Sequence, residues 1–197
     1  MMGRPSNRDE RYEQVMQALV RCVARYGLEG ASLAQVATEA GLTRPLVRYH
    51  LGNRSEMTLA LQAYVLDSFD SQTDALVEAL PKADPGTALV ELLFDDTCGT
   101  SPDMVLALAA LTAKASEEVE LRDACRASVL NFEAAVAGAL RGAYPQAGAG
   151  AVDACAHGVI ALYYNVSSLR PLEMPATWSE TARGLAVKLV RELEDYS

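Results

Sequence analysis

The stretch TRPLVRYHLGNRSEM combines residue types that bind a polyanion. Arg44, Arg48 and Arg54 supply three guanidinium groups and His50 an imidazole, whereas the only carboxylate in the stretch belongs to Glu56. A guanidinium group can donate two parallel hydrogen bonds to a phosphate, and its positive charge persists at any physiological pH. The stretch therefore indicates a surface for a negatively charged partner, although the whole chain has a formal net charge of −9.

The charge of the chain is divided unevenly along its length. Residues 1–57 carry eight arginines and six carboxylates, a net charge of +2. Residues 58–197 carry nine basic and twenty acidic side chains, a net charge of −11. A mildly basic head on an acidic body favours contact between the head alone and a polyanion such as nucleic acid.

Capping residues and glycines predict that the head consists of short helices. Apolar residues recur at helical spacing up to Gly27, which ends the first helix. Ser32 and Gln35 form a capping box at the start of a second helix, which ends at Gly41. Thr43 is the predicted N-cap of a third helix, so two helices follow each other after a very short turn.

This spacing is typical of a helix-turn-helix. Ala37 would allow the second and third helices to approach closely, and Gly41 would adopt the tight turn without Cβ strain. Leu42 and Val47 would fill the small core beneath them. An ordinary helical hairpin needs similar small residues, but it does not explain the polar and basic outer surface of the third helix. The pattern favours DNA binding.

The rest of the chain is predicted to be helical as well. A second capping box, Asn53 to Glu56, begins a helix that runs to about Pro81. Prolines at first helical positions and apolar periodicity indicate further helices over about 84–97, 101–116, 117–142, 152–169 and 178–196. The expected fold class is all-α, with a helix-turn-helix domain over residues 1–52 and a larger helical domain over residues 53–197.

The sequence offers no membrane span, secretion signal or metal site. It lacks an 18-residue apolar run, and its N-terminus lacks the apolar core of a signal peptide, so a cytoplasmic protein is expected. The four cysteines, at positions 22, 98, 125 and 155, are too scattered for a zinc site and are interpreted as small buried hydrophobic residues. We expect no cofactor and no metal.

Two apolar stripes near the C-terminus have the three-four spacing of a helical bundle. Small residues beside the first stripe would allow a neighbouring helix to come close. Both stripes could face the chain's own core. Two helices from each of two copies would instead form a symmetric four-helix bundle, and this homodimer is the favoured interpretation. The predicted interface comprises Val152, Cys155, Val159, Leu162, Val166, Leu169, Trp178, Ala182, Leu185 and Leu189.

Residues 12–61 resemble the DNA-binding domain of the TetR (tetracycline-repressor-like) family of bacterial transcriptional regulators. The resemblance rests on YGLEGASLAQVATEAGLTRPLVRYHLGNRSEM, whereas the remainder matches only as a helical body of suitable size. It implies a homodimer whose third helices enter successive major grooves of a palindromic double-stranded operator. It also implies a body that binds a small-molecule effector and then releases the DNA.

The resemblance also implies roles for individual residues. Base-reading positions of the family fall on Arg44, Pro45, Leu46 and Arg48, and its phosphate contacts fall on Ser32, Tyr49, His50 and Arg54. With Thr43 these residues make up the predicted DNA-binding set. Leu46 stands where a small polar residue is common in the family, and Leu51 replaces the usual aromatic residue. Arg4 and Arg8 precede the first helix and would form either a minor-groove arm or a solvated tail.

Candidate effector-binding residues are the larger apolar and polar side chains of the body: Phe69, Phe94, Leu108, Leu111, Thr112, Phe132, Tyr163, Tyr164 and Asn165. Most of them would serve equally well as core. Two other functions compete with a regulator. One is an effector-free architectural DNA-binding protein. The other is an enzyme built around His157, Tyr164 and the Asp95–Asp96 pair, although these residues form no recognisable catalytic constellation and no catalytic activity is expected.

Overall fold

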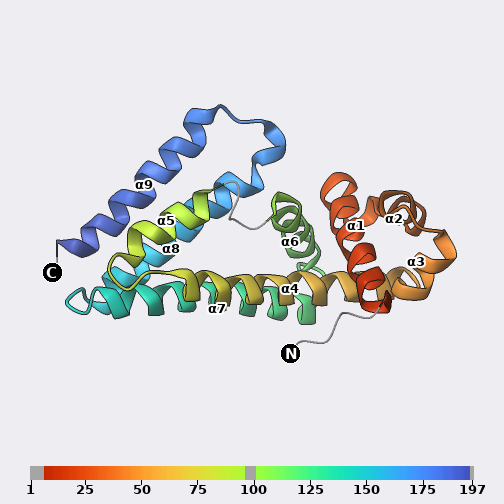
Figure 1. The fold of residues 1–197 in the computed structure, drawn as a ribbon, viewed down its shortest axis with the longest axis horizontal. Coiled ribbons are helices and arrows are strands. Elements are labelled where there is room, and N and C mark those ends of the chain that lie inside the picture. Colours follow the sequence, from red (N-terminus) through yellow and green to blue (C-terminus); the bar gives the residue numbers. More distant parts are fainter. Residues whose placement is uncertain (1–6, 96–100, 196–197) are drawn as a thin grey trace. The chain divides into compact units, whose positions relative to one another are not determined.

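A computed structural model describes residues 7–95 and 101–195 of this protein. Within these residues the secondary structure is entirely helical, so the predicted all-α fold class is confirmed (Figure 1). The helices are α1 (Asn7–Gly30), α2 (Leu33–Ala40), α3 (Arg44–Leu51), α4 (Arg54–Ala79), α5 (Pro85–Phe94), α6 (Pro102–Lys114), α7 (Val119–Ala143), α8 (Ala149–Ser168), the 3₁₀ turn η1 (Arg170–Leu172) and α9 (Ala176–Glu194).

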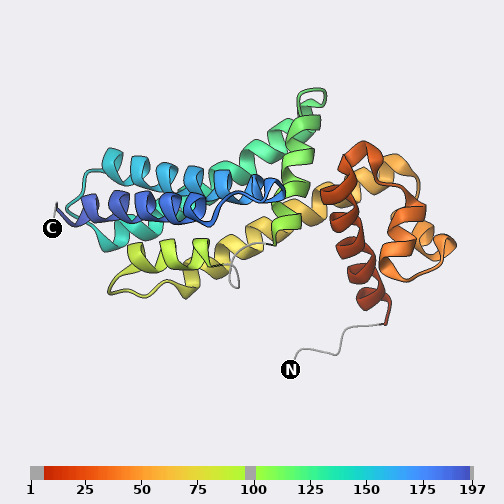
Figure 2. The same cartoon turned by 90° about the horizontal axis from the view of Figure 1, so that it is seen from above.

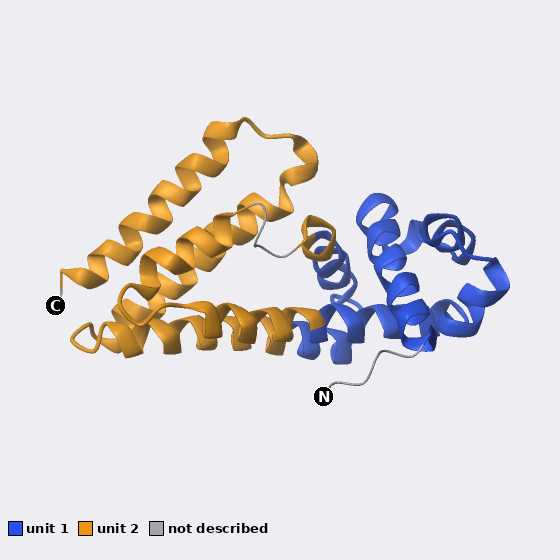
Figure 3. Ribbon diagram, in the orientation of Figure 1, with its two compact units in different colours: residues 1–67, 106–125 blue, residues 68–105, 126–197 orange. Residues whose placement is uncertain are grey.

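The chain forms two compact units (Figure 3). Unit 1 comprises residues 1–67 and 106–125, and unit 2 comprises residues 68–105 and 126–197. Helices α4, α6 and α7 each contribute residues to both units, so the predicted boundary after residue 52 falls inside unit 1. The first half of α4 belongs with the head because Leu61 and Val65 are fully buried and the Tyr64 hydroxyl donates a 2.5 Å hydrogen bond to Glu13 of α1.

The helix boundaries in the head follow from local residue chemistry. Gly27 interrupts α1 with a left-handed φ of 72°, at the predicted position, and one further turn follows it. The Ser32 hydroxyl caps α2 by accepting a bond from the backbone N–H of Gln35, whose side chain accepts from the Ser32 backbone in return. Gly41 ends α2 with a φ of 63°. The predicted capping box and tight turn are therefore present.

Polar contacts fix α2 against α1. The Gln14 amide donates a 2.7 Å hydrogen bond to the backbone carbonyl of Ala40 at the end of α2. Arg21 of α1 donates a 2.6 Å charge-assisted bond to Glu39, and Arg25 lies 3.9 Å from the same carboxylate. These contacts supplement the apolar core of unit 1, where Val15 and Leu19 are among the fully buried side chains. The helix-turn-helix is thereby held in one orientation on α1.

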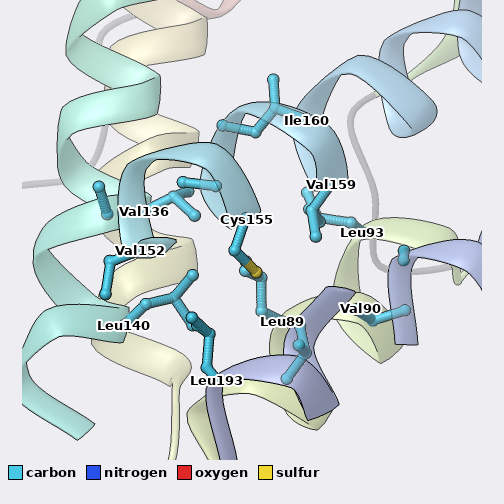
Figure 4. Close-up of a cluster of buried hydrophobic side chains, with 14 of the residues drawn as sticks. Leu89, Val90, Leu93, Val136, Leu140, Val152, Cys155, Val159, Ile160 and Leu193 are labelled. Carbon is cyan, nitrogen blue, oxygen red and sulfur yellow. The ribbon is translucent and has the colours of Figure 1, made fainter. Parts of the chain in front are cut away.

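The core of unit 2 lies among α5, α7, α8 and α9. Figure 4 shows the labelled side chains of these helices, including Cys155, gathered in one apolar cluster. Helices α8 and α9 lie side by side, and α9 also contacts α5 (Figure 2). Gly86 of α5 permits a close approach, because a Cβ at this position would lie only 2.7 Å from the Tyr144 hydroxyl and would also clash with Val190. Gly158 performs a similar role opposite Leu189.

Three of the four cysteines fall within the described residues, and all three are buried free thiols, as predicted. Burial raises the pKa of Cys22 and Cys125, and burial together with Glu192 raises the pKa of Cys155 to about 11. Neutral thiols are poor nucleophiles, so these side chains act as packing residues. Cys98 lies outside the described residues. No described helix is both long and apolar enough to cross a bilayer.

Candidate nucleic-acid interface

The turn between α2 and α3 directs one surface of α3 outward. The Leu42 backbone N–H donates to the Ala37 carbonyl across the turn, which closes the end of α2. Val47 and Leu51, four residues apart on α3, are buried beneath the helix. Leu42 is half-buried rather than fully enclosed. The inner stripe of α3 is thus used for packing, and the opposite stripe is left for a partner.

The outer surface of α3 is basic. Arg44, Pro45, Arg48 and Tyr49 are exposed, with Tyr49 67% accessible. Leu46 is half-buried, so only part of its side chain is available to a partner. No carboxylate occurs in the sequence between Glu39 and Glu56, so nothing on α3 itself neutralises the two arginines. This surface can donate several charge-assisted hydrogen bonds to one polyanion.

His50 sits between two aromatic rings at the end of α3. Its ring centroid lies 5.2 Å from that of Tyr49, in an edge-to-face arrangement, and 6.2 Å from that of Tyr12 in α1. The three rings and Arg8 line a shallow hollow together with Asp9. Two phenols, an imidazole and a guanidinium group thus meet beside the Asp9 carboxylate, and the first four groups can donate hydrogen bonds to phosphate oxygens.

Two predicted contact residues have mixed local roles. Ser32 is half-buried, and its hydroxyl is shared between the Gln35 side chain, at 2.7 Å, and the capping bond to the Gln35 backbone. Thr43 occupies the N-cap position of α3 but makes no side-chain capping bond, contrary to the capping role expected from sequence. Its exposed hydroxyl can therefore bond to an external group.

Arg54, whose predicted phosphate contact stays a prediction, bonds within the protein through Nη2. Its Nη2 donates to the backbone carbonyls of Leu28 and Glu29, at 3.2 and 2.7 Å, and to the Glu29 carboxylate at 2.9 Å. The side chain therefore ties the first turn of α4 to the last turn of α1, where orphan carbonyls and the helix dipole favour a cation. Sequence reasoning missed this role because the partners lie 25 and 26 residues away.

Unit 2 contains a cavity of about 290 Å³. Three of the predicted effector-binding residues line it, namely Phe69 of α4, Phe132 of α7 and Tyr163 of α8. Phe94 of α5 is not among the lining residues, but its ring contacts that of Tyr163 edge-to-face, with the centroids 6.2 Å apart. The sequence did not indicate the other lining residues, which are Gln72, Thr73, Ala75, Leu76, Ala79, Leu92, Leu93 and Ser101. Alanines four residues apart on α4 were the available signal for a recess there.

The other predicted effector-binding residues do not line this cavity. Leu108 and Leu111 are buried side chains of α6, and the Thr112 hydroxyl donates to the Leu108 carbonyl at 2.9 Å. Tyr164 and Asn165 are on the exposed side of α8. A one-residue step along a helix turns a side chain by about 100°, which separates Tyr163 from Tyr164.

The predicted dimer residues divide into two groups. Val152, Cys155 and Val159 belong to the core cluster of unit 2, and Ala182 is also buried. Leu162 and Leu189 are partly buried against that cluster, and Val166 and Leu169 are half-buried. Trp178 and Leu185 are 41% and 45% exposed on α9. The four buried residues are thus corrected to core residues of a single chain, whereas the dimer interface itself stays a prediction.

The residues considered for an enzyme are dispersed. His157 Nδ1 is paired with the Glu133 carboxylate at 2.7 Å, a contact between α8 and α7 on the surface. Asp95 follows the last residue of α5 as its C-cap, and Asp96 lies outside the described residues. Among the residues that the structure describes, no group of three or more His, Cys, Asp or Glu side chains could hold a metal ion.

Comparison with known proteins identifies the class to which this architecture corresponds. A TetR-family transcriptional regulator from Cytophaga hutchinsonii has the same fold, with a TM-score of 0.70 and 16% identity over 96% of this chain and 98% of that one. A TetR regulator from Haloarcula marismortui gives a TM-score of 0.67 and 19% identity over 93% and 97% of the two chains. The structure therefore has the fold of TetR-family transcriptional regulators, and the predicted resemblance is confirmed.

Proteins similar in sequence are also transcriptional regulators. Two HTH-type transcriptional regulators named BetI, from Burkholderia lata and Burkholderia ambifaria, are each 31% identical to this chain over 107 residues. The match spans about half of either sequence, 52% of this chain and 54% of each relative. The sequence matches no model of a known protein family. A protein from Saccharomonospora viridis, described as a transcriptional regulator and solved in complex with choline, shares the fold with a TM-score of 0.69 at 18% identity, over 92% of this chain and 96% of that one.

Proposed function

We propose that this protein is a DNA-binding transcriptional regulator that acts as a homodimer. The observation that carries the proposal is the outer surface of α3, where Arg44 and Arg48 are exposed on a helix-turn-helix that α1 holds rigidly. An α-helix fits the major groove of B-DNA, and arginine pairs with guanine O6 and N7 there. The similarity to HTH-type regulators supports the same conclusion.

The proposed contacts divide into readers and holders. Arg44 opens α3, the end of a recognition helix that meets base edges, and Arg48 follows one turn later. Pro45 and the exposed part of Leu46 would contact thymine methyl groups. Thr43, Tyr49, His50 and Ser32 would contact the phosphate backbone, which fixes register without reading sequence.

Selection from random double-stranded DNA, followed by titration of the selected operator, tests this proposal. We expect a palindromic consensus, because a symmetric dimer presents two identical α3 helices. Arg44→Ala should cost about 1–3 kcal/mol per half-site on the matched operator and less on a mismatched one. Arg122→Ala, at an exposed arginine of α7, is the matched control for charge loss. Failure to select any DNA, or equal losses from both variants, would contradict the proposal.

The proposed dimer uses the outward surfaces of α8 and α9. Tyr164, Trp178 and Leu185 are 37%, 41% and 45% exposed on these two helices, so their side chains are accessible to a partner. The small residues Ala161 and Gly184 beside them are also exposed. Two such helix pairs would form a four-helix bundle across a two-fold axis. This surface replaces the buried residues in our earlier expectation from sequence.

The cavity of unit 2 is the proposed effector site. It is lined mainly by apolar and aromatic side chains with a few polar groups, as small-molecule sites generally are. We expect the regulator to be a repressor that releases its operator when the effector binds. By thermodynamic linkage, operator DNA must then weaken effector binding by the same factor. An effector that binds equally well with and without operator would exclude this form of regulation.

A further inference from the structure

The walls of the cavity in unit 2 carry a distinctive set of chemical groups. Helix α4 contributes the largest share, α5, α7 and α8 complete the walls, and Ser101 precedes α6. Phe69, Phe132 and Tyr163 present three aromatic rings, and alanine and leucine side chains occupy most of the rest. The chemistry of these groups limits which molecules can enter with a favourable free energy.

The described lining residues include none that is charged at neutral pH. Asp70 and Asp74, which neighbour Phe69 and Thr73 in sequence, lie on the exposed side of α4 and do not line the cavity. The Asp70 carboxylate is instead 3.4 Å from the Ser128 hydroxyl. An ion that enters this cavity would lose part of its hydration, and the described walls offer no opposite charge to compensate, which is unfavourable.

Aromatic walls alone can attract a soft cation through the ring faces. The structurally similar regulator from Saccharomonospora viridis was solved with choline, which carries a quaternary ammonium group, so a cationic ligand is the alternative to consider. In this chain, however, the described walls offer no carboxylate to complete such a site. The observations therefore favour a ligand without charge.

Thr73 defines the polar group that the ligand needs. Its side chain is only 8% exposed, and its hydroxyl donates a 2.8 Å hydrogen bond to the Phe69 carbonyl of the preceding helical turn. The donor is therefore occupied, whereas the oxygen lone pairs remain able to accept. Gln72, the preceding residue of α4, can both donate and accept a hydrogen bond. A hydroxyl or N–H group on the ligand matches both side chains.

We propose that this cavity selects uncharged, largely apolar ring compounds that carry a hydrogen-bond donor. The inference rests on the effector role proposed above and adds the chemical class of the effector. Three features of the described residues of unit 2 support it: cavity walls without a charged side chain, three aromatic rings and the Thr73 oxygen.

A matched series of naphthalene probes tests the charge preference in the full-length, DNA-free protein. 2-Naphthylmethanol, 2-naphthoate and (2-naphthylmethyl)trimethylammonium share one ring system and differ in charge. Isothermal titration should show the alcohol binding at least about tenfold more tightly than either ion. Equal or tighter binding of the cation or the anion would overturn the proposal, as would failure of the alcohol to bind at millimolar concentration.

Variants locate the effect in the cavity. Gln72→Glu adds a carboxylate to the wall and should shift the preference toward the cation, whereas Gln62→Glu, elsewhere on α4, should not. Thr73→Val keeps the side-chain shape and should weaken the alcohol but not its methyl ether, which has no donor. Unchanged preferences in both cavity variants would contradict the assignment. Probe binding without any selected DNA would refute the regulator instead, and DNA selection without probe binding would refute only the ligand class.

Discussion

Arg44 and Arg54 are ten residues apart and chemically identical, but their surroundings give them different roles. Arg44 is exposed at the start of α3, whereas Nη2 of Arg54 contacts three oxygens at the end of α1. The Arg54 side chain is half exposed, so its ion pair with Glu29 contributes little by itself. The two backbone carbonyls matter more, because they are orphan acceptors at a helix terminus. We therefore interpret Arg54 as a residue that positions α4 on the head.

Arg54→Ala should lower the free energy of unfolding by about 1 kcal/mol. The backbone carbonyls of Leu28 and Glu29 would lose a charged hydrogen-bond donor, but water molecules would partly replace it. The salt dependence of operator binding should stay unchanged, since no phosphate contact is lost. Chemical denaturation and operator titrations at several salt concentrations measure the two quantities. If the slope of log affinity against log salt falls by about one per half-site, Arg54 contacts phosphate and the positioning role is wrong.

Helix α5 shows how a single missing side chain fixes the packing of an element. It begins with Pro85 at its first position and an Asp84 cap, where the carboxylate accepts from the Thr87 backbone at 3.1 Å. Gly86 then allows this first turn to rest against Val190 of α9 and the Tyr144 hydroxyl. Helix α9 also packs on α8. The position of α5 therefore affects the helix pair that is proposed to form the dimer.

Gly86→Ala should destabilise the protein by about 1–3 kcal/mol, because the new methyl group overlaps Val190 and Tyr144 and the helices must move apart. Gly138→Ala in α7 is the matched control, since a Cβ there meets nothing within 4 Å. That substitution should raise stability by about 0.5–1 kcal/mol through better helix propensity. Thermal and urea unfolding of both variants provide the comparison. Similar stability of the two variants would contradict the prediction, because it would show that α5 can shift away from α9 without a loss of stability.

The exposed apolar side chains of α8 and α9 bear on how two copies of the chain would associate. Trp178 and Leu185 lie seven residues apart on α9, two turns along one side of the helix. Ala186 and Val190, on another side of the same helix, are in the core of unit 2. Helix α9 is therefore apolar on two sides, and only one of them is satisfied within the chain.

Leu185→Glu should convert a dimer into monomers, because a carboxylate buried without a partner in the proposed bundle is strongly unfavourable. Sedimentation velocity at micromolar concentration measures the change. Leu59→Glu is the matched control, because Leu59 of α4 is even more exposed, at 61%. A monomeric wild type, or a dimer that survives the Leu185 substitution, would rule out this interface. Because each half-site is weak alone, the monomeric variant should also lose most operator affinity.

Local chemistry made much of the fold predictable from sequence. The breaks at Gly27 and Gly41 and the Ser32–Gln35 capping box all depend on residues within one helical turn of each other. A second such box appears where Asn53 caps α4 and Glu56 accepts from the Asn53 backbone. Helical periodicity likewise indicated the all-α class. These signals act over three or four residues, so the order of the chain contains them directly.

Packing between helices set the features that depend on contacts between residues distant in sequence. Periodicity showed that Val152 and Val159 had to be buried, but not that residues of α5, α7 and α9 would bury them in place of a second copy. The role of Arg54 depended on carbonyls that only the folding of α4 against α1 brings near. The cavity depended on how closely four helices approach, because it is a volume that side chains leave unfilled. Sequence thus determined which residues are apolar enough to be buried and where the helices begin. Packing determined which helices bury those residues and which surfaces remain accessible to a ligand or a partner.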